Sequence, residues 1–217
     1  GSKVAKNSFY LQGDATVATD LMRAIDAATG RVAIYFAVPP AVAALACKAL
    51  STQKLPAGIV LALEKPFGTD LASAKALNRL LQTFVAEDQV FRVDHFLGKS
   101  TVLNLIGLRF ANRIFEPLLS AQNVARVEIV FEAVLGLEGR AGYYDKAGAL
   151  IDMIQSHLLQ VLAIATMEPP SSIASEDLRG AMAQSLRATR PWLKNGTESR
   201  RARYTAGKVG RRTMPSY

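Results

Sequence analysis

Residues 31–38 (RVAIYFAV) decide the fold, together with two similar runs further along the chain, residues 58–63 (GIVLAL) and residues 89–93 (QVFRV). Each run is short, rich in β-branched and aromatic residues and almost uncharged, which is typical of a buried strand. The first run stops before Pro39, because proline cannot donate a hydrogen bond to a sheet. The sequence therefore predicts three buried strands in this part of the chain.

Helices are expected between these strands. Residues 41–50 are rich in alanine, a strong helix former, and Asp70 is suited to cap a helix that runs to about residue 86. Apolar strands that alternate with helices predict a parallel sheet covered on both faces. Ligands of such sheets bind beyond the carboxyl ends of the strands, where the loops that begin at Pro39, Glu64 and Asp94 would lie. We therefore expect a ligand site at that edge.

The pattern changes after Gly98, where longer amphipathic segments replace the alternation of strands and helices. The predicted fold class is α/β plus α+β. A partial Rossmann-type parallel sheet is expected in residues 1–94, followed in residues 95–217 by the start of an α+β domain with an antiparallel sheet, whose residues 193–217 are expected to be flexible. The elements expected after Gly98 are helices at residues 100–119, 150–166 and 175–188, a half-exposed strand at residues 125–131 and a loop at residues 136–148.

Composition and charge argue against several classes of protein. The net charge is +8, but eight basic residues and one acid lie between Arg190 and Arg212, so the rest of the chain carries about +1. A nucleic-acid groove would spread its basic residues over the fold and interleave them with aromatic residues. We therefore expect no nucleic-acid partner. The single cysteine, Cys47, leaves no internal disulfide and suits a reducing compartment, which predicts a cytoplasmic location.

Residues 148–167 are apolar enough to raise the question of a membrane span. They carry several strongly polar side chains, too many for a helix surrounded by lipid, so no membrane partner is expected. These side chains are Asp152, Gln155, Ser156, His157 and Gln160.

The chain has two histidines, and each lies close to an aspartate in the sequence: Asp94 precedes His95, and Asp152 precedes His157. Imidazole exchanges protons near neutral pH, and a neighbouring carboxylate fixes its tautomer and stabilises its charged form. The pattern favours proton-transfer chemistry, with ordinary structural histidines as the alternative. On an α-helix Asp152 and His157 would diverge by about 140°. They would then flank a ligand, or His157 would find another carboxylate, for which Asp94 is the candidate.

Basic side chains at the expected sheet edge point to an anion. His95 and Lys99 are four residues apart and would share one face of a helix that begins here. Donors at a helix N-terminus bind anions, so a phosphate would fit, and a charged helix cap is the alternative. Lys65 precedes Pro66 after the second strand, where a cis peptide bond can turn the chain tightly around a ligand. The alternative there is a surface turn.

Five motifs follow one another along the chain. They are Ala37-Val38-Pro39-Pro40, Glu64-Lys65-Pro66-Phe67-Gly68, Arg92-Val93-Asp94-His95-Phe96-Leu97-Gly98-Lys99, Leu108-Arg109-Phe110-Ala111-Asn112, and the segment from Asp152 through His157 to Gln160. In order and approximate spacing they resemble the glucose-6-phosphate dehydrogenase family. The resemblance covers about residues 35–170 and, more weakly, the rest of the chain.

This resemblance implies oxidation of the C1 hydroxyl of glucose 6-phosphate to a lactone, with hydride transfer to NADP, as in the pentose phosphate pathway. His157 would be the general base and Asp94 the carboxylate that holds it. His95 and Lys99 would hold the sugar phosphate, and Asp152 would accept hydrogen bonds from sugar hydroxyls.

The resemblance also implies that Lys65 lies between substrate and cofactor and that Pro39 borders the nicotinamide. Residues 1–94 would then be part of an NADP-binding domain and residues 95–217 part of the substrate domain. No metal site is implied. The family forms homodimers or homotetramers, so the same assembly is expected of the parent of this chain.

Three departures from the family pattern leave alternatives open. The family's Gly-x-x-Gly-Asp-Leu-Ala turn would lie upstream of Gly1, so we expect a fragment that is inactive alone. Ala133 stands where the family has a sugar-binding glutamate, and Glu132 would face the other side of a strand. Phe96 replaces a common tyrosine and removes a hydroxyl contact to phosphate. The alternatives are a non-catalytic sugar-phosphate-binding or assembly relative, and an active relative with a different sugar phosphate.

Overall fold

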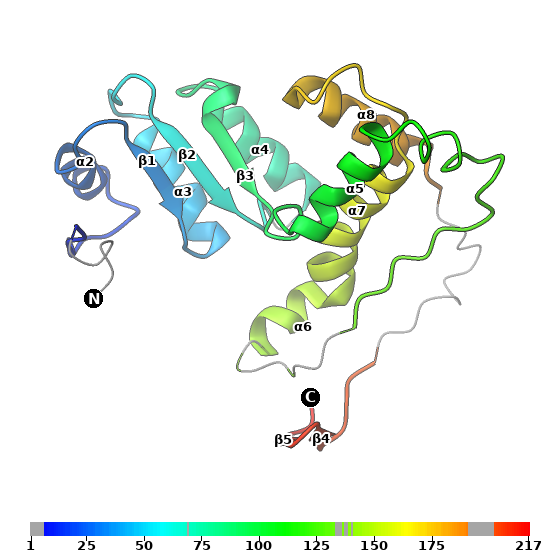
Figure 1. The fold of residues 1–217 in the computed structure, drawn as a ribbon. Helices are drawn as coiled ribbons and strands as arrows, with labels where there is room; N and C mark the ends of the chain where they lie inside the picture. Colours follow the sequence, from blue (N-terminus) through cyan, green and yellow to red (C-terminus); the bar gives the residue numbers. More distant parts are fainter. Residues whose placement is uncertain (1–6, 69, 133–135, 137–138, 140, 191–201) are drawn as a thin grey trace. The chain divides into compact units, whose positions relative to one another are not determined.

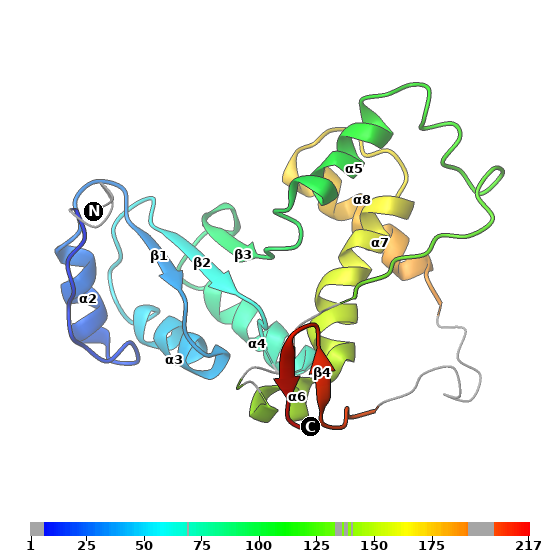
Figure 2. The same ribbon diagram turned by 60° about the horizontal axis from the view of Figure 1, so that its bottom comes forward.

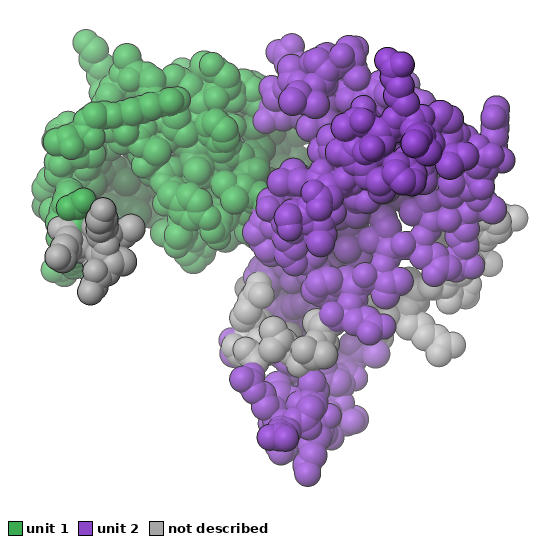
Figure 3. All heavy atoms as spheres, viewed as in Figure 1, with its two compact units in different colours: residues 1–94 green, residues 95–217 purple. Residues whose placement is uncertain are grey.

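The computed structural model describes residues 7–68, 70–132, 136, 139, 141–190 and 202–217. The chain divides into two compact units, unit 1 (Gly1–Asp94) and unit 2 (His95–Tyr217), which Figure 3 shows in different colours. Each unit has its own set of helices and strands.

Unit 1 contains a three-stranded parallel sheet in the order β1-β2-β3 (Figure 1). Ile34 lies opposite Leu61, and Leu61 lies opposite Val90, so one apolar row crosses all three strands. The predicted strands and their parallel pairing are confirmed. The strands are β1 (Ala33–Phe36), β2 (Val60–Glu64) and β3 (Val90–Val93).

Helices connect these strands, as the sequence pattern predicts. Asp70 caps α4, accepting a hydrogen bond from the Ser73 amide at 2.7 Å in a reciprocal capping box. The α4 helix ends earlier than predicted, in a tighter turn in which the Thr83 amide donates to the Leu80 carbonyl at 3.0 Å and the Thr83 hydroxyl donates to the same carbonyl at 2.6 Å. The helical elements of unit 1 are α2 (Ala18–Asp26), α3 (Pro40–Leu50), α4 (Leu71–Leu81) and the 3₁₀ turn η1 (Glu87–Gln89).

The core of unit 1 lies between one face of the sheet and its helices. Figures 1 and 2 show α3 and α4 on that face, and Cys47 and Leu50 of α3 pack there against Leu61. The expectation of a sheet covered on both faces is wrong for the described residues. Tyr35 and Phe91, which share a row on the opposite face, are 54% and 52% exposed.

Helices are the main regular elements of the described part of unit 2. The helices α5, α7 and α8 pack together around Arg109, Ala163, Ile164 and Met167, which are all buried. The stretch from α6 to α7 runs almost without interruption, but Gly148 within it has a non-helical backbone with φ 62°. The helical elements are α5 (Ser100–Phe110), α6 (Ala141–Ala149), the π-helix η2 (Leu150–Leu158), α7 (Leu159–Thr166) and α8 (Ser175–Ala188).

The α5 helix is shorter than the predicted span to residue 119. The Ala111 amide makes the last helical bond, to the Gly107 carbonyl at 3.1 Å, and the Asn112 side-chain amide donates to the same carbonyl at 3.0 Å, a local side-chain bond that competes with continuation of the helix. Pro117 lies further along, and a proline there could not continue a helix.

Residues 125–131 were expected to form a strand and do not. They are extended and largely exposed, and no other described segment pairs with them. A strand needs a neighbouring strand that pairs with its backbone groups, so alternating apolar and polar residues were not sufficient to predict one here. The Arg126–Glu128 ion pair at 2.8 Å follows the two-residue period of an extended chain.

The predicted loop at residues 136–148 also differs, because helix α6 begins at Ala141. The antiparallel sheet of this part is instead a two-stranded hairpin of β4 (Gly207–Val209) and β5 (Arg212–Met214), visible in Figure 2. Arg203 and Tyr217 join this end of the chain to Asp145 of α6, at 2.9 Å and 2.7 Å. Within residues 193–217, residues 193–201 lie outside the described part. The predicted fold class, a parallel sheet followed by a part with an antiparallel sheet, is confirmed.

One helical stretch among the described residues, Ala147–Thr166, is long and apolar enough to cross a membrane on length and composition alone. Core helices of soluble proteins meet the same criterion. His157 is buried in this stretch and Asp152 carries a charge, and both features disfavour a lipid environment.

Candidate active site

Two predicted site residues of unit 1 meet at the carboxyl edge of the sheet. Lys65 directly follows β2 and Asp94 directly follows β3, and the Lys65 Nζ lies 2.8 Å from the Asp94 Oδ2. Both side chains are largely shielded, with 15% and 8% exposure. The Lys65–Pro66 peptide bond is cis. The ion pair therefore joins the ends of adjacent strands at the edge where ligands of parallel sheets bind.

The third strand end at this edge carries Pro39. It is the N-cap residue of α3, and its carbonyl accepts a hydrogen bond from the Ala43 amide at 3.0 Å. Nearby on the exposed face of the sheet, Tyr35 donates a hydrogen bond to Glu64, which raises the pKa of the tyrosine hydroxyl. All three loops that the sequence predicts at this edge thus begin there.

In unit 2, the segment from His95 to Lys99 forms turns that lead into α5. Lys99 is the N-cap residue of α5, so His95 lies before the helix. The expectation that His95 and Lys99 share one helical face is therefore wrong, although both lie beside the helix N-terminus. The first turn of α5 contains no acidic residue, so its backbone amides favour an anion.

His157 lies on the π-helix η2 rather than on an α-helix, and its side chain is only 5% exposed. The Ser156 hydroxyl donates to the Ile151 carbonyl, five residues back, at 2.6 Å. Single turns of π-helix occur often at functional sites. A π-helix closes its turn over five residues, so Asp152 and His157 approach one face more closely than the predicted divergence allows. Asp152 accepts a hydrogen bond from the Tyr143 hydroxyl at 3.0 Å.

The two histidines lie together in an aromatic cluster within unit 2. The imidazoles of His95 and His157 pack edge to face, with ring centroids 4.8 Å apart. Phe96 stacks on His157 at 4.1 Å with the ring planes 23° apart, and packs edge to face against Phe131 at 5.4 Å. The Lys99 Nζ lies 3.9 Å from the centroid of the Phe96 ring. A cation, two imidazoles and an aromatic ring thus form one compact group.

The structure brings the predicted residues together in two groups. Lys65 and Asp94 meet in unit 1, beside the strand end that carries Pro39. His95, Lys99 and His157 meet in unit 2, where Phe96 links them. Asp152 lies on the same π-helix as His157. Ala133 lies outside the described residues, and Glu132 is exposed.

Sequence reasoning missed two contacts of the site. Phe96 was noted only for the hydroxyl it lacks, whereas its ring stacks on His157. Tyr143 was placed in a loop and is instead the helical residue that donates to Asp152. The position of Phe96 between His95 and Lys99 was the available signal for the first contact. The contact between Tyr143 and Asp152 depends on helix α6, which the sequence pattern did not indicate.

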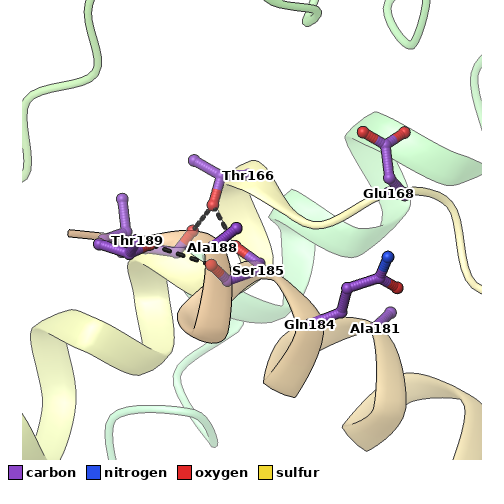
Figure 4. Close-up of a pocket in the computed structure, with 8 residues that line it drawn as sticks. Thr166, Glu168, Ala181, Gln184, Ser185, Ala188 and Thr189 are labelled. Atoms are coloured by element: carbon purple, nitrogen blue, oxygen red, sulfur yellow. Dashed lines mark hydrogen bonds between the residues drawn. The ribbon is translucent and has the colours of Figure 1, made fainter.

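A separate pocket lies in unit 2 between α7 and α8 (Figure 4). Thr166 and Ser185 share a hydrogen bond at 2.7 Å in its wall, and Glu168 is the charged residue among those lining it. None of the predicted site residues lines this pocket. Because it holds none of the residues that the sequence motifs single out, the site is sought at the two groups above.

Comparison with known proteins agrees with this placement. The family model described as "Glucose-6-phosphate dehydrogenase, NAD binding domain" matches residues 2–104, and "Glucose-6-phosphate dehydrogenase, C-terminal domain" matches residues 106–217. Glucose-6-phosphate 1-dehydrogenase of Bacillus subtilis is 43% identical over 159 residues, covering 72% of this chain and 32% of the relative. The Rhizobium meliloti enzyme of the same name is 42% identical over 192 residues, covering 87% of this chain and 39% of the relative.

Solved structures are similar as well. The crystal structure of glucose-6-phosphate 1-dehydrogenase from Mycobacterium avium has a TM-score of 0.77 at 38% identity, covering 86% of this chain and 41% of that one. A glucose-6-phosphate dehydrogenase in complex with its substrate glucose-6-phosphate has a TM-score of 0.65 at 39% identity, covering 72% and 33%. The chain spans about a third to two fifths of the length of the relatives it matches.

The parallel sheet and its family model place the chain among proteins with a Rossmann-type dinucleotide-binding domain. More specifically, the chain belongs to the glucose-6-phosphate dehydrogenase family. The resemblance seen in the sequence motifs is thereby confirmed.

Proposed function

We propose that the protein oxidises the C1 hydroxyl of glucose 6-phosphate to the lactone and transfers the hydride to NADP. Membership of the glucose-6-phosphate dehydrogenase family supports this reaction. The observation that carries it is the cluster of His95, Phe96 and His157, because it puts a buried imidazole beside the basic turn at the start of α5. The buried imidazole of His157 suits proton transfer, and the basic turn at the start of α5 suits binding of a phosphate.

In this proposal His157 is the general base that removes the proton of the C1 hydroxyl. Burial shields its imidazole from bulk water. Asp94 would hold His157 and stabilise its imidazolium form. Asp94 could hold His157 and keep its ion pair with Lys65 at the same time, because a carboxylate can accept several hydrogen bonds.

His95 and Lys99 would hold the phosphate of the substrate. Both residues are exposed beside the N-terminus of α5, where backbone amides point outward without an acidic neighbour in the first turn. Positive side chains and helix amides reinforce each other toward an anion. Asp152 would accept hydrogen bonds from the sugar hydroxyls, and it could keep the Tyr143 donor because a carboxylate accepts several hydrogen bonds.

Lys65 and Pro39 would border the nicotinamide at the carboxyl edge of the sheet. The residues present there fit that part of a dinucleotide, since the loops after β1 and β2 leave adjacent parallel strands at one edge. NADP supplies the hydride acceptor when it is bound. The ion pair to Asp94 holds the Lys65 side chain at that edge.

The broader setting follows from the same proposal. The reaction belongs to the pentose phosphate pathway, and the proposed location is the cytoplasm. Assembly into homodimers or homotetramers is proposed by analogy with the family. A non-catalytic sugar-phosphate-binding or assembly relative is the second candidate, favoured by Ala133 at the position of the family's sugar-binding glutamate.

The full-length parent of this chain and its His157→Ala variant would be assayed for NADPH formation with glucose 6-phosphate. We expect activity in the parent and a loss of kcat of about 10²- to 10⁴-fold in the variant, the usual contribution of a general base. A variant with near-normal kcat would contradict the role of His157. A parent that binds glucose 6-phosphate but turns over no sugar phosphate would instead favour the non-catalytic relative, and a preference for another sugar phosphate would reassign the substrate.

A further inference from the structure

Phe96 has no role in the proposed reaction, yet it makes the closest ring contact of the buried imidazole. Its ring centroid lies 4.1 Å from that of His157, with the planes 23° apart. His95 also contacts the His157 ring, with ring centroids 4.8 Å apart and ring planes 70° apart. His157 is thus packed by one ring face to face and by another ring edge to face.

These two contacts restrain the imidazole without blocking its chemistry. The nitrogens of an imidazole lie on the edge of the ring, so a partner stacked on the face does not compete for the hydrogen bonds that they make in the ring plane. Offset stacking is among the preferred arrangements of aromatic pairs. A base must approach the proton it removes within hydrogen-bonding distance, so the tilt of the ring plane matters to the reaction.

Phe96 is itself held from other directions. Phe131 packs against it edge to face at 5.4 Å, and the Lys99 Nζ lies 3.9 Å from its ring centroid. A cation over an aromatic ring is attracted by the negative face of the ring. The same ring therefore touches both the proposed phosphate-binding cation and the proposed base.

We propose that Phe96 is a positioning residue for His157, fixing by its stack the plane in which the imidazole accepts a proton. This inference rests on the proposed function, because it assigns Phe96 to the base of that reaction. It predicts that an aromatic ring is required at this position and that a hydroxyl group on it is not. The Phe96→Leu variant removes the ring, Phe96→Tyr keeps it, and Phe131→Leu is the matched control because Phe131 touches Phe96.

The first measurement is the chemical shift of the imidazole protons by NMR. The chain has two histidines, so the spectrum holds two imidazole spin systems, and a His95→Asn variant assigns them. We expect the His157 ring protons to be shifted upfield by the Phe96 ring current in the native chain and in Phe96→Tyr and Phe131→Leu. The upfield shift should be lost in Phe96→Leu. Equal chemical shifts of the His157 ring protons in the native chain and in Phe96→Leu would show that Phe96 does not stack on His157.

The second measurement separates kcat from KM in the full-length parent of this chain. Phe96→Leu should lower kcat by about 10- to 100-fold, because small misplacements of a catalytic group have effects of this size, while KM for glucose 6-phosphate changes less. Phe96→Tyr, which keeps the aromatic ring, should retain the native kcat. An unchanged kcat, or a rise in KM alone, would overturn positioning and leave Phe96 as a partner of Lys99. A near-normal kcat in His157→Ala would show separately that His157 is not the base, and it would overturn this inference as well. The NMR measurement would still show whether Phe96 stacks on His157.

Discussion

The Lys65 Nζ lies 2.8 Å from the Asp94 Oδ2, so an ion pair joins the carboxyl ends of strands β2 and β3. Both side chains are mostly shielded from water. Such a pair gains strength from the reduced dielectric, but each charge would be costly if its partner were removed. The ends of the two strands are therefore held at a fixed distance at the edge where the ligand is proposed to bind.

Replacing Lys65 with methionine should lower the free energy of unfolding of unit 1 by about 3 kcal/mol, because the Asp94 carboxylate would lose its cation. The measurement is the urea dependence of Cys47 labelling, which reports exposure of the unit 1 core. The double variant Lys65→Met/Asp94→Leu should recover part of the loss. Asp20→Asn breaks the more exposed Asp20–Arg23 pair and should cost less than about 1 kcal/mol. Equal losses in Lys65→Met and Asp20→Asn would contradict a special role for the Lys65 pair.

Gly68→Ala should destabilise the loop after β2. A Cβ at this position would lie 2.6 Å from the Ala74 backbone nitrogen and 2.8 Å from the Ser73 Oγ, inside the capped first turn of α4. Backbone atoms of a helix cannot move aside cheaply, so we expect a loss of about 1–3 kcal/mol, the usual cost of overpacking. Thermal unfolding followed by circular dichroism measures it.

Gly180→Ala is the matched control for that substitution. Gly180 lies within α8, and a Cβ there would meet nothing within 4 Å. Alanine should therefore stabilise the helix by about 1 kcal/mol. If both alanine variants unfolded alike, the close contact at Gly68 would not govern its stability.

The sequence predicted the parallel sheet well because its signals are local. Runs of apolar residues, a proline stop after β1 and an N-cap at Asp70 each act within a few residues. Residues 125–131 show the limit of this reasoning, since alternation suggested a strand but pairing depends on a distant partner. The open face of the sheet, with Tyr35 and Phe91 exposed, could not be predicted for the same reason.

The candidate site shows a similar division. Motifs located Lys65, Asp94 and His157, but the Lys65–Asp94 pair follows from strands that become neighbours only on folding. The π-helix around His157 is a second example, because an α-helical period gave the wrong angle to Asp152. Side-chain packing such as the stack of Phe96 on His157 depends on rotamers that sequence spacing does not encode.

Arg109→Met should destabilise unit 2. The Arg109 side chain is buried, donates to the Ile164 carbonyl at 2.8 Å and pairs with Glu116 at 3.2 Å, so it ties α5 to the end of α7. Loss of both partners should cost about 2–3 kcal/mol. Amide hydrogen exchange in α7 measures the change.

Lysine at position 109 should not restore stability, because an ammonium lacks the planar fork that reaches two acceptors. Arg126→Met is the exposed control, since Arg126 is 78% exposed in its pair with Glu128 and should change stability by less than about 1 kcal/mol. Full protection of α7 in Arg109→Met would show that the buried guanidinium is dispensable.

Cys47 should be inert in the folded chain. Burial raises the pKa of its thiol from 9.0 to about 11, so little thiolate forms near neutral pH, and its side chain is 0% exposed. We expect slow reaction with a thiol reagent in the native chain and fast reaction in urea. Fast labelling that does not depend on urea would contradict this burial.

The raised pKa also sets the direction of a pH effect on stability. Between pH 9 and 11 the unfolded thiol loses its proton while the folded thiol keeps it. The unfolded state then binds fewer protons, so the free energy of unfolding falls as pH rises, by at most about 1.4 kcal/mol per pH unit from this group. Below pH 9 the thiol contributes no slope. Urea unfolding of the native chain and of Cys47→Ala at pH 8 and pH 10 isolates the effect, because the other titrating groups are common to both. The native chain should lose more stability than Cys47→Ala over this interval, and equal losses would show that the thiol is not buried as the structure has it.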